Sequence, residues 1–69
     1  MQRMSEAQGI KLFVDILERD YLALYDELSD DGYIADEYVI DNLATRAPRI
    51  YMIVLEKAQV EAQKRGYVI

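Results

Sequence analysis

The sequence contains neither cysteine nor histidine. Without cysteine the chain cannot form a disulfide, and without both residue types it lacks the usual protein ligands of zinc. The same two absences remove the most common general base and the best nucleophile used by enzymes. We therefore expect a protein without catalytic residues, bound metal or cofactor.

Proline and glycine are scarce, with one proline and three glycines among 69 residues. A chain of this length forms a single domain, residues 1–69, and few of its positions interrupt a helix. It buries only about 60% of its unfolded surface, so its own core is marginal. Because 52% of the residues are apolar, apolar surface is left over, and we expect a homodimer.

Long hydrophobic runs are also missing. The longest strongly apolar run is Ile50–Leu55, far short of the roughly 20 residues that span a bilayer. No segment has the layout of a signal peptide. A helix lying on a membrane would be cationic opposite its apolar face, whereas the first half of this chain is acidic. We expect a cytoplasmic protein that does not associate with membranes.

The apolar residues of the first half recur with the period of a helix. Ser5 followed by Gln8 fits a capping box, and the apolar stripe from Ile10 to Leu28 predicts one helix over residues 6–29. A second, smaller apolar strip lies on the flank of this helix and can face a third helix or another subunit. Its members are Leu12, Ile16 and Ala23.

The second half predicts two more helices and no strand. Asp36 is a natural N-cap for a short helix over residues 36–44. Thr45 can cap a third helix over residues 46–65, which tolerates Pro48 in its first turn. The last three residues can fold back onto the end of that helix. The predicted fold is all-α, a small three-helix bundle or a helical hairpin completed by homodimerisation.

Charge is distributed unevenly. The net charge is −5, and ten of the thirteen acidic residues lie between Asp15 and Asp41, where Arg19 is the only basic residue. From Arg46 onward basic residues outnumber acidic ones. The acidic part should repel nucleic acid and attract basic protein surfaces. The simpler interpretation is that the acidic residues only keep a small protein in solution.

The most acidic stretch, SDDGYIADEY at residues 29–38, partly resembles an EF-hand calcium loop around Gly32. The first ligand positions of such a loop would be Glu27, Ser29 and Asp31. The twelfth position, which requires a bidentate carboxylate, is Tyr38. A capped turn between two helices therefore explains the stretch better than a metal site does.

This stretch and the helix after it are also the best candidate for a partner-binding surface. Tyrosines supply large contact area at low entropic cost, and carboxylates around them steer basic partners. The alternative is that the tyrosines cover the edge of the core and the carboxylates are only solvated. The candidate residues are Asp30, Asp31, Tyr33, Asp36, Glu37, Tyr38 and Asp41.

These features favour a non-enzymatic protein-interaction module, an inhibitor or regulator that occludes a basic surface of a nucleic-acid-handling protein. In size and charge it resembles the very small acidic inhibitors of phages and mobile elements, such as anti-CRISPR proteins. One alternative is a helix-turn-helix DNA-binding regulator that uses Arg46 and Arg49, although its recognition helix would begin with core-like residues. A second alternative is a structural dimer with no other partner.

Overall fold

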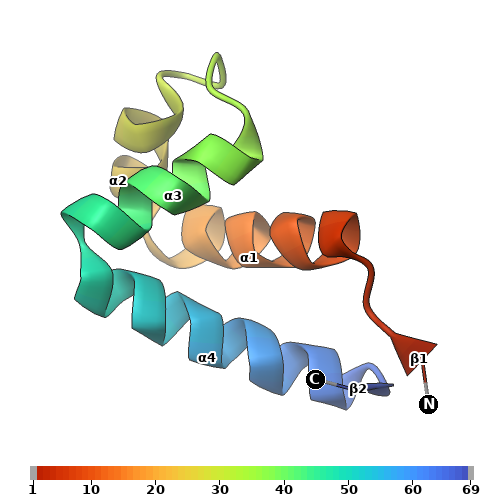
Figure 1. The fold of residues 1–69 in the computed structure, drawn as a ribbon. Helices are drawn as coiled ribbons and strands as arrows, with labels where there is room; N and C mark the ends of the chain where they lie inside the picture. Colours follow the sequence, from red (N-terminus) through yellow and green to blue (C-terminus); the bar gives the residue numbers. More distant parts are fainter. Residues whose placement is uncertain (1, 69) are drawn as a thin grey trace.

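The computed structural model describes residues 2–68, and within them the fold is all-α with four helices (Figure 1). The helices are α1 (Glu6–Asp20), α2 (Leu22–Ser29), α3 (Asp36–Arg46) and α4 (Pro48–Lys64), flanked by short strands β1 (Gln2–Arg3) and β2 (Tyr67–Val68). Helix α1 contacts each of the other three helices. In this described part of the chain, no helix is long and apolar enough to cross a membrane.

The prediction of one helix over residues 6–29 is wrong, because the chain bends at Tyr21. This residue leaves the helical region, with φ −137° and ψ 53°. Its N–H still donates to the Leu17 carbonyl at 2.8 Å, and its own carbonyl accepts from the Tyr25 N–H at 2.9 Å. Both backbone polar groups of Tyr21 therefore remain hydrogen-bonded although the helix is interrupted there. The apolar residues of α1 and α2 form one continuous pattern in the sequence because both helices pack their apolar sides against the same core.

A second bend of the same form separates α3 from α4 at Ala47, which has φ −140° and ψ 68°. Its N–H donates to the Leu43 carbonyl at 2.8 Å, and its carbonyl accepts from the Tyr51 N–H at 3.0 Å. Helix α4 then begins with Pro48 at a position where the missing N–H costs no hydrogen bond. The predicted boundary between residues 44 and 46 is thus corrected to residue 47.

The helix caps agree only partly with the sequence-based prediction. The capping box is confirmed, because the Gln8 N–H donates to Ser5 Oγ at 3.1 Å and the Ser5 N–H donates to Gln8 Oε1 at 2.9 Å. The N-cap of α3 is Ala35, and Asp36 is the first residue of the helix. Thr45 caps nothing, since its hydroxyl donates backwards within α3 to the Asp41 carbonyl at 3.1 Å.

The core draws on all four helices. Leu17, Leu43, Val39 and Val54 are completely buried, and Leu28 of α2 is 2% exposed. Burial of each such side chain stabilises the folded state by about 1.5–3 kcal/mol relative to leaving it exposed. Aromatic packing between α1 and α4 adds to this core, since the ring centroids of Phe13 and Tyr51 are 5.4 Å apart.

The second apolar strip of the first helix does not face another subunit. Leu12 and Ile16 belong to the core and are only 5% and 3% exposed. Ala23 lies beyond the bend and is exposed. The strip therefore gives no support to dimerisation, which stays a prediction.

Two short parallel strands join the ends of the described chain, a feature absent from the sequence-based prediction. Gln2 pairs with Tyr67 and Arg3 pairs with Val68. Gly66, with φ 87°, ends the turn after α4. Tyr67 then packs against the core, as predicted for a segment that folds back, while Ile69 lies outside the described residues.

Candidate partner-binding surface

The turn after α2 is built around Ser29, which is 1% exposed. The Ser29 carbonyl accepts from the Gly32 N–H at 3.1 Å and from the Ile34 N–H at 2.9 Å. Its hydroxyl donates to the Asp26 carbonyl at 3.4 Å. The loop is thus held from its buried side, against which Ile34 also packs, while the side chains of Asp30, Asp31 and Tyr33 face solvent.

Three successive residues of this turn have a positive φ. The values are 50° at Asp30, 54° at Asp31 and 92° at Gly32. Aspartate tolerates the left-handed region better than most residues, and glycine adopts it freely. The sequence Asp-Asp-Gly therefore encodes a tight reversal, with Asp30 as the left-handed C-cap of α2. Both carboxylates are exposed on it.

Both tyrosines of the candidate surface are outside the core. Tyr33 is 88% exposed and Tyr38 is 59% exposed. A tyrosine that covered the edge of the core would bury most of its ring, as Tyr51 does against Phe13. Neither candidate tyrosine is thus needed for the packing of the monomer.

The carboxylates around these tyrosines are exposed and carry no ion pair among residues 2–68. They are Asp30, Asp31, Asp36, Glu37 and Asp41. The ion pairs of the described residues use other acidic groups. Arg46, for example, contacts Glu27 at 3.0 Å and none of these five. Their charge therefore remains available to a partner.

The seven candidate residues form two neighbouring groups. Glu37, Tyr38 and Asp41 of α3 line a depression of about 320 Å³ next to the start of α1. The other four, which belong to the turn and to the first residue of α3, lie outside that depression. Its remaining lining residues, Glu6, Ile10 and Ile40, were not among the predicted site residues.

The resemblance to a calcium loop does not extend to the structure. Glu27 pairs with Arg46, and Ser29 is buried with its hydroxyl turned to a backbone carbonyl. Within residues 2–68, no three acidic side chains come close enough together to hold a metal ion.

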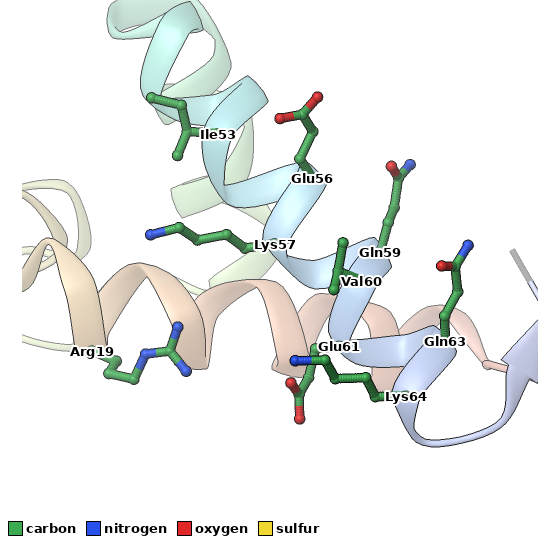
Figure 2. A pocket seen from close by; sticks show the side chains of 9 residues that line it. All are labelled: Arg19, Ile53, Glu56, Lys57, Gln59, Val60, Glu61, Gln63 and Lys64. Carbon is green, nitrogen blue, oxygen red and sulfur yellow. The ribbon is translucent and has the colours of Figure 1, made fainter.

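A larger depression of about 800 Å³ runs along α4, and none of its lining residues is among the predicted site residues (Figure 2). It is lined by Arg19 of α1 and by eight residues of α4. Near Arg19, the Asp20 carboxylate lies 2.8 Å from Arg19 Nε and 2.8 Å from Lys57 Nζ. Hydrogen bonds from these two cations hold the pKa of Asp20 well below its usual range, and Asp20 raises the pKa of Arg19.

Comparison of the chain with protein-family models, with curated proteins and with solved structures finds no match.

Proposed function

We propose that this chain is a non-enzymatic binding module that occludes a basic surface on a nucleic-acid-handling protein. The observation that carries the proposal is the exposure of Tyr33 and Tyr38 among five carboxylates without ion pairs in the described chain. Desolvated tyrosines supply the binding energy of many interfaces, whereas surrounding charges mainly set the association rate and the choice of partner.

The mode of action would be steric. The Asp30–Tyr33 turn projects at one end of the molecule, and the acidic side of α3 continues from it (Figure 1). A partner site that normally holds a nucleic-acid backbone carries lysines and arginines, which these carboxylates attract in place of phosphates. No bond is made or broken, so the effect depends only on affinity and concentration.

The helix-turn-helix alternative has less support. Arg46, one of its two proposed contacts, is engaged with Glu27 at 3.0 Å. The exposed side of the first turns of α4 includes Met52 and Ile53, which are 55% and 42% exposed. Apolar side chains at that position do not read base edges.

A tagged pull-down with two charge-matched variants tests the proposal. One bait carries Asp31→Asn, Glu37→Gln and Asp41→Asn, which removes three charges from the proposed surface. The control carries Asp15→Asn, Glu18→Gln and Asp26→Asn, three exposed acids of α1 and α2. We expect one dominant protein that survives nuclease treatment and is lost only with the first bait.

Two results would contradict the proposal. Equal loss with both baits would show that net charge alone causes the capture. Capture that disappears with nuclease would show that nucleic acid carried it, as expected for the helix-turn-helix alternative.

A further inference from the structure

The outward side of α4 carries apolar residues that the monomer leaves uncovered. Ile53 and Val60 are 42% and 51% exposed, whereas Val54 and Ala62 of the same helix are buried. Since successive helical residues turn by about 100°, Ile53 and Val60 lie on one line along the helix, at least about 100° away from the buried pair. This line is therefore directed away from the core.

Opposite charges flank this apolar line on its two sides. Figure 2 shows Lys57 extending from one side of α4 and Glu56 from the other, with Val60 on the next turn of the helix. Glu56 makes no ion pair within residues 2–68. Lys57 contacts Asp20 at 2.8 Å, but its side chain remains 45% exposed, and an ammonium group has three donors.

We propose that this face of α4 binds a second copy of the chain, with the two α4 helices parallel. A two-fold axis along the helices places Ile53 against the partner's Ile53 and Val60 against the partner's Val60. It also brings the Glu56 side of each helix next to the Lys57 side of the other at nearly the same height. The face is thus complementary to itself, because apolar side chains meet apolar side chains and acidic side chains meet basic ones.

The direction follows from the charges. An antiparallel pair would place Glu56 beside the partner's Glu56 and Lys57 beside the partner's Lys57, and like charges at such an interface are repulsive. Helix α4 has 17 residues, about 25 Å at 1.5 Å per residue, which is enough for several turns of contact. This inference is independent of the proposed function, since it uses neither the Asp30–Tyr33 turn nor α3.

Disulfide cross-linking tests the geometry directly, because the natural chain has no cysteine. In a parallel pair, Val60→Cys places two thiols side by side, and mild oxidation should give a covalent dimer. The control is Leu22→Cys, at a 55% exposed position of α2 outside the proposed face, which should form no covalent dimer under the same oxidation. Equal cross-linking of both variants would overturn the proposal. So would cross-linking found only in a mixture of Ile53→Cys with Val60→Cys, because that result indicates antiparallel helices.

Charge reversal tests the pairing without thiols, by sedimentation equilibrium from about 10 µM to about 1 mM protein. Glu56→Lys alone places a lysine at position 56 next to the partner's Lys57, and Lys57→Glu alone places a glutamate next to the partner's Glu56. Each variant should therefore dimerise at least about tenfold more weakly than the natural chain. An equimolar mixture of the two variants restores both opposite pairs and should recover the dimer. Failure of the mixture to recover it, with both variants helical by circular dichroism, would overturn the proposal. A natural chain that stays monomeric throughout the range would also overturn it.

Discussion

Lys57 Nζ lies 2.8 Å from Asp20 Oδ2, although the two residues are 37 positions apart in the chain. Arg19 completes the arrangement, with Nε at 2.8 Å from Asp20 Oδ1. Asp20 is the last residue of α1, immediately before the bend at Tyr21. The three side chains therefore connect the end of α1 to the middle of α4.

The first prediction concerns acid stability. Because the pKa of Asp20 is lowered in the fold by Arg19 and Lys57, its ionised form stabilises the folded state. That contribution is complete above the ordinary carboxyl pKa of about 3.9 and is lost as pH falls through the lower folded value. We expect Asp20→Asn to lower the urea midpoint at neutral pH, and the difference from the natural chain to shrink with acidification.

The matched control for this prediction is Asp15→Asn. Within residues 2–68, Asp15 forms an ion pair only with Lys11, at 3.5 Å, and the two side chains are 56% and 77% exposed. Exposed pairs of this kind contribute little. A loss of stability as large as that of Asp20→Asn, or a difference that does not depend on pH, would contradict the assignment.

The second prediction pairs two glycines with opposite outcomes. Gly32 has φ +92°, so Gly32→Ala should cost about 1–3 kcal/mol in backbone strain even though an added Cβ would meet no atom within 4 Å. Gly9 lies inside α1, where a Cβ would only touch Met4 Sδ at 4.0 Å. Gly9→Ala should therefore stabilise the chain by about 0.5–1 kcal/mol. Denaturant unfolding of both variants measures whether the free energy of unfolding falls for Gly32→Ala and rises for Gly9→Ala.

The third prediction concerns the core at the first bend. Leu17 is completely buried and its carbonyl accepts the hydrogen bond from Tyr21. Leu17→Ala should reduce the free energy of unfolding by about 2–5 kcal/mol. Leu22, on the other side of the bend, is 55% exposed, so Leu22→Ala should change it by no more than about 0.5 kcal/mol. Similar costs for both variants would contradict this description of the bend.

The fourth prediction separates binding from folding at the tyrosines. Tyr33→Ala and Tyr38→Ala should leave the helical circular dichroism and the unfolding midpoint nearly unchanged, since both rings are exposed. Together they should weaken binding to the captured partner by more than about 2 kcal/mol. Tyr51→Ala, which removes the ring packed against Phe13, should instead destabilise the fold.

The helices were predictable because apolar periodicity and caps are local signals. Ser5 and Gln8 marked the start of α1, and Asp36 marked the start of α3 to within one residue. The bend at Tyr21 was not predictable from the same signals. No glycine or proline stands there, and both sides of the bend keep their apolar residues in phase because they pack on one core.

The residue types of the candidate surface were predictable from the sequence, but the way those residues are arranged in space was not. The sequence identified exposed acids and tyrosines near a turn, but the neighbours of Tyr38 include Glu6 and Ile10, which come from the start of α1. Only the packing of α1 beside α3 brings them together. The apolar line on α4 was not predictable for a similar reason, since Ile53 and Val60 are β-branched apolar residues like the buried Val54, and only the packing of α4 decides which of them is exposed.

The pairing of Gln2 with Tyr67 and of Arg3 with Val68 has a consequence for the order in which the molecule opens. Because α1 already packs against α4, this pairing adds only two residues on each strand to a fold that the helices hold together. So small a contact should form last and separate first. Its amide protons should exchange with solvent far faster than those around Leu17, by opening of the chain ends while the four helices remain folded.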